Sequence, residues 1–445
     1  MQIPPSNRTS ADQPAAGLEL APFRGVRYAQ DRVTGLADVT SPPYDVIFGD
    51  NEDQLIAADP HNVVRLILPQ PVPGRPGEEY HDAAVLLQEW LAEQILIIDP
   101  DPALYVYEQT AADGRSEVQR GLIGRLRLVP ADAGIVLPHE DVSPGPVAGR
   151  LALMEATQAN LEPIFLLYDG SGQDGAGSGA AARIVAATAS RPPLVEARIA
   201  DGPRHRLWAV TDEAELAAIA ADLAPRQALI ADGHHRYAAY LGLQERHRET
   251  GDGPGPWDYG LALLVDSSSY PPHIGAIHRV IAGLDIQRAA KLAAGAFDVQ
   301  PLTADLTGAL RELAGASARG PAFVIAGDGH FYLLTSPDPD QAATAMPAGF
   351  SGHWRSLAAA ILQRLLITGV WAVTDDERTV RVIHHDAEAA LRTAGETSGT
   401  AVLCSPMSPA DVYEVAAQGE KIPRKSTSFA PKPRTGLVLR TFAQG

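Results

Sequence analysis

The stretch from Ala228 to Tyr237 constrains the fold of this chain more than any other. A short apolar run, Ala228–Ala231, is typical of a buried strand; it ends at Asp232-Gly233 and is followed by the basic cluster His234–Arg236 and a helical pattern. The first turn of a helix has N–H groups without partners and a partial positive charge, so it attracts anions. The pattern therefore predicts a strand–turn–helix unit with a phosphate site at the turn.

Three residue types at this turn suit that chemistry. Gly233 allows the backbone to approach a ligand closely, and Arg236 carries a planar fork of donors for phosphate oxygens. Asp232 could cap the helix, orient the imidazole of His234 or help to hold Mg²⁺. The same residues are explained equally well by an ordinary Asp-Gly turn followed by a solvent-exposed His-His-Arg sequence without a ligand.

The composition limits the class of protein. The chain has 445 residues, of which 45% are hydrophobic, enough for two or three packed domains. The net charge of −18 disfavours binding to nucleic acid, because a phosphodiester backbone is repelled. The only cysteine, Cys404, excludes an internal disulfide and a cysteine zinc cluster, and no run is long and apolar enough to span a membrane. We expect a cytoplasmic protein with small-molecule partners, and pairing into a homodimer stays open.

We expect an α/β protein of the α+β class, with a loose tail at 1–18, a core at 19–283 with insertions, and a C-terminal α+β lobe at 284–445 whose segment 419–440 returns to the core. Periodicity predicts helices at 81–94, 215–223 and 356–367, and strands at 164–168, 228–231 and 259–265. Hairpins are predicted for 103–107 with 121–129, around Asp113-Gly114, and for 322–326 with 330–335. Pro42 and Pro43 predict a rigid loop without helix at 44–47, and 169–179 reads as a flexible loop.

A late basic loop is the second candidate for binding phosphate. Three of the four lysines of the chain fall between Lys421 and Lys432. Lys425 and Lys432 could grip phosphate groups, and Ser426 or Thr427 could hydrogen-bond a phosphate oxygen. A basic surface loop on an acidic protein is the alternative interpretation.

Other polar residues are weaker candidates for binding a substrate. On the loop after Pro43, Asp45 could bind an ammonium group, and Arg65 could bind a carboxylate, although a local cap or ion pair explains either one. Basic and aromatic residues on either side of the Asp232–Arg236 turn could line the same cleft, or could be strand residues whose side chains are already paired. These residues are Arg206, Trp208, His278 and Arg279. A metal site of His234 with His235 is disfavoured, since adjacent helical residues point about 100° apart.

Two motifs carry a resemblance to a known family. The box Asp232–Ala239 and the upstream Pro138-His139-Glu140 are similar to the motifs of free serine kinases in the ParB/sulfiredoxin superfamily. This resemblance implies that Gly233, His234, His235 and Arg236 hold nucleotide phosphates, that Glu140 is the catalytic base, and that ATP or ADP and Mg²⁺ are used. Glu140 and Asp232 lie 92 positions apart, which requires an insertion between them.

The chain also resembles, nearly end to end, a large bacterial family of uncharacterised proteins. The matching segments include 22–28, 41–47, 160–165, 277–280 and 423–438. Together, the two motifs and this resemblance imply a nucleotide-dependent phosphotransferase that acts on a small hydroxyl substrate, free L-serine or, in reverse, O-phosphoserine. We expect Glu140, Asp232 and His234 to be its catalytic residues. A non-catalytic nucleotide switch that uses the same turn is the alternative.

Overall fold

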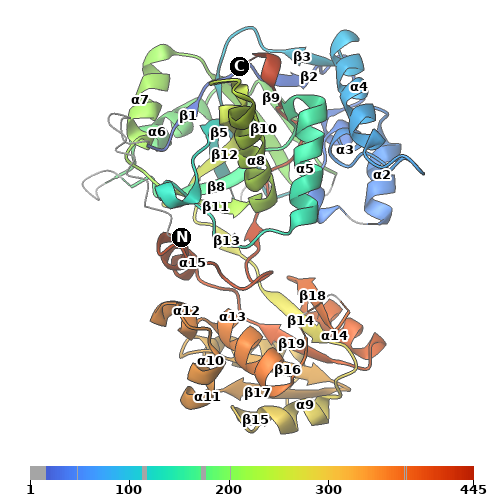
Figure 1. The fold of residues 1–445 in the computed structure, drawn as a ribbon, viewed down its shortest axis with the longest axis vertical. Helices are drawn as coiled ribbons and strands as arrows, with labels where there is room; N and C mark the ends of the chain where they lie inside the picture. The colour runs from blue at the N-terminus through green and yellow to red at the C-terminus, as the bar shows by residue number, and fades with distance from the viewer. Residues whose placement is uncertain are drawn as a thin grey trace, which may run out of the picture.

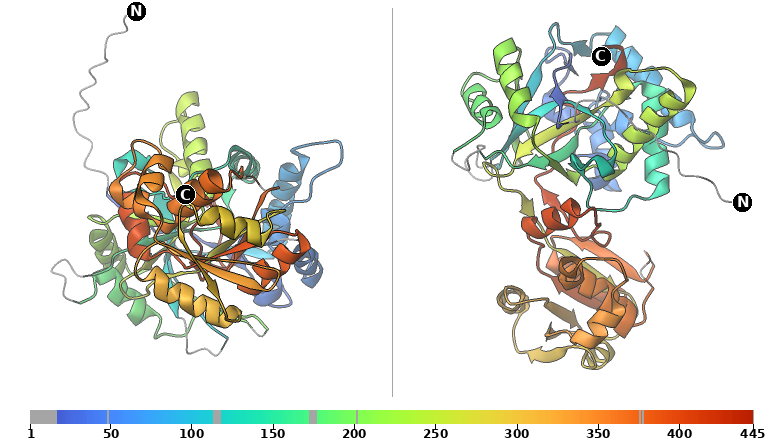
Figure 2. Two further views of the ribbon diagram at one scale, coloured as in Figure 1. Left: turned by 90° about the horizontal axis from the view of Figure 1, so that it is seen from below. Right: turned by 60° about the vertical axis from the view of Figure 1, so that its left-hand side comes forward.

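The computed structural model describes residues 17–47, 49–112, 118–171, 177–200, 202–374, 376 and 378–444. The chain forms two lobes joined by a narrow waist, each built around its own sheet (Figure 1). The same two bodies are separate in the right-hand view of Figure 2. The α+β class expected from the sequence is confirmed.

The first lobe contains a nine-stranded mixed sheet. Its path runs β6-β11-β8-β12-β5-β4-β10-β9, and β1 pairs with β5. The strands are β1 (Leu20–Ala21), β4 (Leu104–Thr110), β5 (Gln119–Arg127), β6 (Val136–Leu137), β8 (Ile164–Tyr168), β9 (Val195–Arg198), β10 (Arg204–Val210), β11 (Ala228–Asp232) and β12 (Tyr259–Asp266). Strand β11 is parallel to β6 and antiparallel to β8.

Helices cover both faces of this sheet because its strands alternate two apolar sets. Leu104 and Val106 face one core and Tyr105 and Tyr107 the other, as the period of two requires. One core includes side chains of α5 (Pro144–Thr157), α6 (Ala180–Thr188), α7 (Glu213–Leu223) and α8 (His234–Thr250). The other includes side chains of α1 (Leu36–Val39), α3 (Val64–Ile67) and α4 (Glu78–Ala92), with α2 (Asp50–Ala58) and the pair β2 (Val26–Tyr28) and β3 (Leu96–Ile98) beside them.

The second lobe is a six-stranded antiparallel sheet in the order β15-β17-β16-β19-β14-β18. Its strands are β14 (Ile277–Ile281), β15 (Asp298–Leu302), β16 (Phe323–Gly327), β17 (His330–Thr335), β18 (Val380–His384) and β19 (Thr400–Cys404). Helices α10 (Leu306–Ser317) and α14 (Ala387–Glu396) pack on one face. The other face packs against α9 (Ile286–Ala293) and the π-helix Ile361–Val370, near α11 (Pro339–Ala345), α12 (Gly352–Ser356) and α13 (Ala358–Ala360).

The end of the chain returns to the first lobe. After α15 (Pro409–Ala417), which lies at the waist, β20 (Phe429–Ala430) pairs with β13 (His273–Ile274) and β21 (Arg440–Thr441) pairs with β7 (Ala159–Asn160) (Figure 1). Leu439 also exchanges backbone hydrogen bonds with Val26. We call residues 419–440 the return segment; it is fastened along the first lobe.

Most predicted elements are present. The pairs β4–β5 and β16–β17 are antiparallel hairpins, although the turn at Asp113-Gly114 lies outside the described residues, as does the middle of the predicted loop 169–179. The expectation of no helix at 44–47 is wrong, because a 3₁₀ turn covers Tyr44–Val46. Pro43 restricts only its own φ and the residue before it, so a turn can begin directly after it.

The predicted helix 356–367 is divided. Leu357 has an extended backbone, with ψ 135°, which ends α12 before α13 and the π-helix follow. Within the described part of the chain, no helix has the length and apolar character needed to cross a membrane.

Candidate functional site

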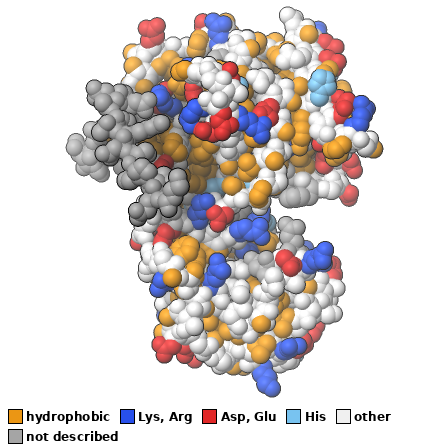
Figure 3. Space-filling view, viewed as in Figure 1, with side chains coloured by type: hydrophobic (Ala, Val, Ile, Leu, Met, Phe, Trp, Pro, Cys, Tyr) orange, Lys and Arg blue, Asp and Glu red, His pale blue; other side chains and the backbone are white. Residues whose placement is uncertain are grey.

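A cavity of about 490 Å³ at the waist brings together all three predicted catalytic residues. The first lobe contributes Asp45, Glu140, Asp232 and His234 to its lining, the return segment Lys425, Thr427 and Lys432, and the second lobe His384 and His385. Figure 3 shows basic and histidine side chains at the narrowing between the lobes. Residues that are far apart in the sequence therefore share one cavity.

A lysine between two carboxylates forms the centre of the cavity. The Nζ atom of Lys432 lies 2.5 Å from Asp45 Oδ2 and 2.5 Å from Asp232 Oδ1. Burial would lower the pKa of Lys432, but the charges of Asp232 and Asp45 more than reverse this and raise it. Burial would likewise raise the pKa of Asp232, but Lys432 and Arg236 lower it overall. Lys432 and Asp232 are therefore both charged at neutral pH.

Glu140 lies on the loop after β6 and contacts the return segment. The hydroxyl of Thr427 donates to Glu140 Oε1 at 2.8 Å, and the same oxygen atom of Thr427 lies 2.8 Å from His139 Nε2. Burial raises the pKa of Glu140, and the Thr427 hydrogen bond and Lys425 offset this only in part. The charge of Asp232, which lines the same cavity, raises it further.

The turn between β11 and α8 has the expected geometry. Gly233 has φ +95°, a left-handed conformation, and a Cβ atom there would lie 2.9 Å from Ile164 Cγ2. No side chain caps the start of α8, and Ala231, Asp232 and His234 line the cavity beside it. The helix thus begins at the cavity wall with its first N–H groups free of a side-chain cap.

The basic cluster at this turn is divided between the cavity and the interior. His234 lines the cavity, and its Nε2 accepts from the backbone N–H of His139 at 3.3 Å. Burial, followed by the charge of His235, lowers the pKa of His234 to about 3, so its ring is neutral. His235 points elsewhere, with Nε2 accepting from the backbone of Ser143 at 3.0 Å.

Arg236 is buried, at 4% exposure, and is not part of the cavity lining. Its guanidinium donates to Asp232 Oδ2 and to the carbonyl of Pro163, each at 2.6 Å. It therefore fixes the orientation of the Asp232 carboxylate from behind.

The structure does not bring the other expected substrate residues to this cavity. Arg65 donates to the carbonyl of Ile56 at 3.0 Å, in a separate depression beside α4. Arg206 is paired with the buried Glu108, and Trp208 is a core residue whose indole N–H donates to the carbonyl of Arg191 at 2.8 Å. Their contacts are those of structural residues on β10.

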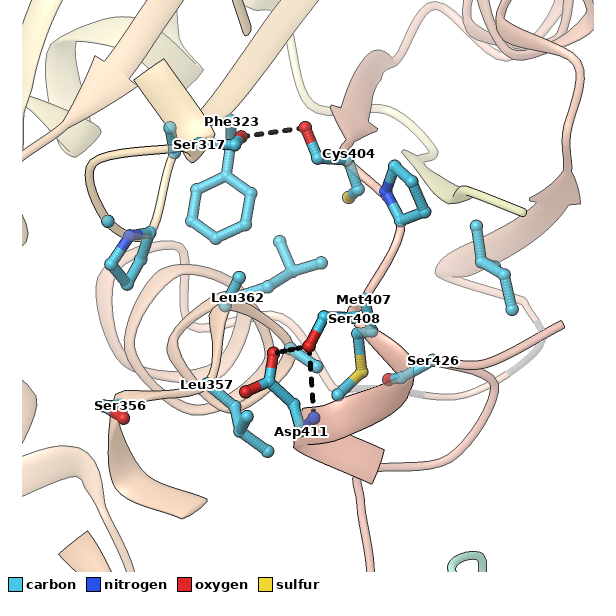
Figure 4. A pocket seen from close by; sticks show the side chains of 18 of the residues that line it. Ser317, Phe323, Ser356, Leu357, Leu362, Cys404, Met407, Ser408, Asp411 and Ser426 are labelled. Carbon is cyan, nitrogen blue, oxygen red and sulfur yellow. Dashed lines mark hydrogen bonds between the residues drawn. The ribbon is translucent and has the colours of Figure 1, made fainter. Parts of the chain in front are cut away.

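His278, Arg279 and Ser426 also lie apart from the cavity lining. His278 Nδ1 accepts from the backbone of Cys404 at 3.2 Å. Arg279 donates to the carbonyls of Arg424 at 3.2 Å and Lys425 at 2.7 Å, and so supports the return segment from the second lobe. Arg279 and Ser426 line a second cavity of about 310 Å³, formed mainly by the second lobe (Figure 4).

Six polar lining residues were not among the site residues predicted from the sequence: Gln109, His205, His384, His385, Ser428 and Arg434. His205 belongs to the basic piece on β10, but alternation along the strand directs it to the face opposite Arg206 and Trp208. Strand periodicity could have separated the two sets. Nothing in the sequence indicates that the end of β18 reaches the first lobe.

The oxygen atoms at the cavity suit a magnesium ion bound together with phosphate. No three His, Cys, Asp or Glu side chains in the described part of the chain are placed to hold a metal by themselves. Mg²⁺, however, is commonly held by one or two carboxylates plus substrate phosphates and water. Asp232 meets that requirement, since each carboxylate oxygen has lone pairs beyond those used by Lys432 and Arg236.

Comparison with solved structures found distant similarity. Free serine kinase in complex with AMP is 13% identical, with a TM-score of 0.36, over 76% of this chain and 94% of that chain. A conserved hypothetical protein from Pyrococcus furiosus is 11% identical, with a TM-score of 0.34, over 76% and 97%. SbnI with a C-terminal truncation, from Staphylococcus aureus, is 12% identical, with a TM-score of 0.35, over 72% and 87%.

A search of the curated proteins found no relative of the chain. A family model does match: it covers residues 20–360, from the first strand to the end of α13, and includes both motifs and most of both lobes. Because this is well over half of the sequence, the chain belongs to the family described as "Protein of unknown function (DUF1015)".

Proposed function

We propose that this protein is a nucleotide-dependent phosphotransferase that acts on the hydroxyl group of a small substrate, free L-serine or, in reverse, O-phosphoserine. The observation that carries the proposal is the joint presence of Glu140, Asp232 and Lys432 in one cavity. These are a candidate base, a candidate metal ligand and a cation for the transferring group. Phosphoryl transfer depends on such positioning and charge stabilisation more than on covalent chemistry.

The start of α8 is the proposed site for the nucleotide phosphates. Its first N–H groups have no side-chain cap, and the left-handed Gly233 keeps the turn free of a side chain. Lys425 and Lys432 from the return segment supply positive charge at the same cavity. Arg236 acts in this proposal as a positioning residue for Asp232, because its Nη2 donates to Asp232, its Nη1 donates to Pro163 and its side chain is not part of the cavity lining.

Glu140 is the proposed general base. A serine hydroxyl is a weak nucleophile until a carboxylate accepts its proton. The raised pKa of Glu140 makes its carboxylate a better proton acceptor than an exposed carboxylate. Thr427 holds one oxygen, Oε1, so that the other is left for the substrate.

Asp232 is the proposed ligand of Mg²⁺, which when bound would neutralise charge on the phosphates. Asp45 is the proposed partner of the substrate ammonium group. Its Oδ1 atom is buried and has no hydrogen-bond partner among the residues that the structure describes, so a donor from the substrate would satisfy it. Because Arg65 lies elsewhere, Lys425 is the proposed partner of the substrate carboxylate.

The first experiment is direct. Purified protein is incubated with ATP or ADP, Mg²⁺ and L-serine, and phosphoserine is measured by mass spectrometry. We expect phosphoserine with at least one of the two nucleotides. Tight nucleotide binding with no amino-acid product would contradict the kinase proposal and favour a nucleotide switch.

The second experiment removes the base. Glu140→Gln should lower the rate of transfer by about 10²–10⁴-fold, because the amide cannot accept the proton, while nucleotide binding measured by calorimetry is retained. The matched control is Glu396→Gln on the exposed end of α14, which should leave both unchanged. Unchanged turnover in Glu140→Gln would exclude Glu140 as the base.

A further inference from the structure

One buried side chain at the cavity has an unused polar atom. His205 is 2% exposed and lines the cavity on the side of β4 and β10. Its Nδ1 lies 2.9 Å from the hydroxyl of Tyr107, whereas its Nε2 is buried and has no hydrogen-bond partner in the described part of the chain. Buried polar atoms are rarely left unpaired, so an unpaired one at a cavity points to a ligand.

The imidazole of His205 is held rigidly. The Tyr107 hydroxyl accepts from the backbone N–H of Arg434 at 3.1 Å and lies 3.0 Å from Gln109 Oε1. The rings of Tyr107 and His205 are stacked, with centroids 6.0 Å apart and planes at 16°. A ring fixed on one edge presents its other nitrogen in a single direction, which is the arrangement of a recognition residue.

The chemistry of this nitrogen favours an uncharged partner. Burial, with a contribution from the charge of Arg434, lowers the pKa of His205 to about 3, so the ring is neutral and does not attract phosphate by charge. Nε2 is then either one donor or one acceptor, depending on the tautomer. A hydroxyl group can pair with either, because it both donates and accepts.

The return segment contacts three parts of the cavity in succession along its sequence. Thr427 contacts Glu140, Lys432 contacts Asp232, and the backbone of Arg434 contacts Tyr107 beside His205. Lys432 and Arg434 are two steps apart along the chain, a span of at most about 7 Å. The candidate base Glu140 and His205 therefore lie towards opposite ends of the stretch 427–434, and Lys432, the proposed phosphate ligand, lies between these ends. In-line transfer likewise places the acceptor hydroxyl and the nucleotide on opposite sides of the transferred phosphoryl group.

We propose that His205 is a specificity residue that hydrogen-bonds through Nε2 to a ribose hydroxyl of the bound nucleotide. This inference rests on the proposed function, since it assumes that the cavity takes a nucleotide. It adds a contact that neither sequence motif contains, from strands remote from both.

The test compares nucleotides that differ by one hydroxyl. Calorimetry is performed on the full chain with ADP, 2′-deoxy-ADP and 3′-deoxy-ADP. The unmodified protein should bind one of the two deoxynucleotides about 5- to 10-fold more weakly than ADP, the effect of one net hydrogen bond. His205→Phe should bind ADP about 5- to 10-fold more weakly than the unmodified protein and should no longer distinguish the three ligands.

The matched control is His273→Phe, the same change at an exposed histidine outside the cavity lining, which should behave as the unmodified protein. Equal affinity of the unmodified protein for all three ligands would overturn the role of His205, and this result needs no variant. Full discrimination retained in a folded His205→Phe protein would overturn it as well. Failure of the unmodified protein to bind ADP at all would instead overturn the proposed function on which the inference rests.

Discussion

At the scale of single residues, the centre of the cavity depends on charge balance. Lys432 is the cation between the carboxylates of Asp45 and Asp232, and Arg236 supports Asp232 from the interior. Without the lysine, the two carboxyl groups would lose the cation that they share. The arrangement that suits phosphate and Mg²⁺ is therefore also an element of stability.

Replacing Lys432 by Met should lower the free energy of unfolding by about 2–3 kcal/mol, because the carboxylates lose their shared cation in a largely buried site. Chemical denaturation measures the effect, and Mg²⁺ should restore part of the loss by occupying the vacated position. Lys291→Met, at an exposed lysine on α9, is the control and should change stability little. A Lys432→Met protein as stable as the parent would contradict the charge-balance argument.

The same cluster predicts a dependence of stability on pH. The pKa of Asp232 is lowered in the folded protein below its usual value of 3.8. Its contribution to stability is therefore present above that value and is lost as pH falls through the lower folded pKa. Lys432→Met should weaken this acid dependence, which thermal unfolding between about pH 2 and pH 5 would measure.

Glu140 predicts a dependence of stability on pH that is opposite to that of Asp232. Its pKa is raised in the folded protein above the usual 4.5, so the folded state binds the proton more tightly than the unfolded state does. The associated stability is present below pH 4.5 and is lost as pH rises through the folded pKa. Glu140→Gln should thus be more stable than the parent at pH 7, and the difference in melting temperature should shrink towards pH 4. A constant difference across this range would contradict the shift.

At the scale of elements, the turn between β11 and α8 fixes the position of the cavity wall. Gly233→Ala should destabilise the protein by about 1–3 kcal/mol, because φ is positive there and the new Cβ would lie 2.9 Å from Ile164 Cγ2. The control is Gly242→Ala in the same helix, where the nearest atom, Leu151 Cδ2, would be 3.4 Å away. That change should be neutral or stabilising, since alanine favours helix. Urea unfolding of the two variants gives the comparison, and equal effects would contradict it.

Local signals in the sequence predicted this element well and the rest of the cavity less well. The switch from an apolar run to a helix at Asp232-Gly233 is encoded within ten residues, so strand, turn and helix follow from it. The direction in which the Arg236 side chain points does not follow from these residues, because one of its partners is Pro163, far away in the sequence. A helical position alone cannot tell whether a long basic side chain points to a ligand or to a carbonyl in the interior.

Strand alternation explains another difference. Arg206 and Trp208 were the expected ligand-binding residues of their basic and aromatic piece, whereas His205, one position away, lines the cavity. The period of two was visible, but which face of β10 looks towards the cavity depends on the sheet order and on the return segment. The roles assigned to individual residues, including Glu140 as base, remain predictions.

At the scale of the whole molecule, the cavity is assembled from both lobes. His384 and His385 come from the second lobe, and His385 Nε2 lies 2.9 Å from the hydroxyl of Ser428 on the return segment. A ligand in this cavity should therefore restrain both lobes. This restraint would couple the motions of the two lobes even without direct contact between their sheets.

Hydrogen–deuterium exchange with and without ADP tests this coupling. Nucleotide should slow exchange at the start of α8, along residues 425–434 and at 384–385, by binding across the waist. The outer strands β15 and β17 lie at the far edge of the second sheet and serve as the internal control, with no change expected. Protection confined to the first lobe would show that the second lobe takes no part in binding.

The return segment has a consequence for how the protein is made. Lys425, Thr427 and Lys432 are synthesised after Asp45, Glu140, Asp232 and the two histidines of the second lobe, yet they line the same cavity. A chain shortened before Lys425 lacks these three cavity-lining groups. The cavity as described here therefore exists only once this late segment has folded back onto the first lobe.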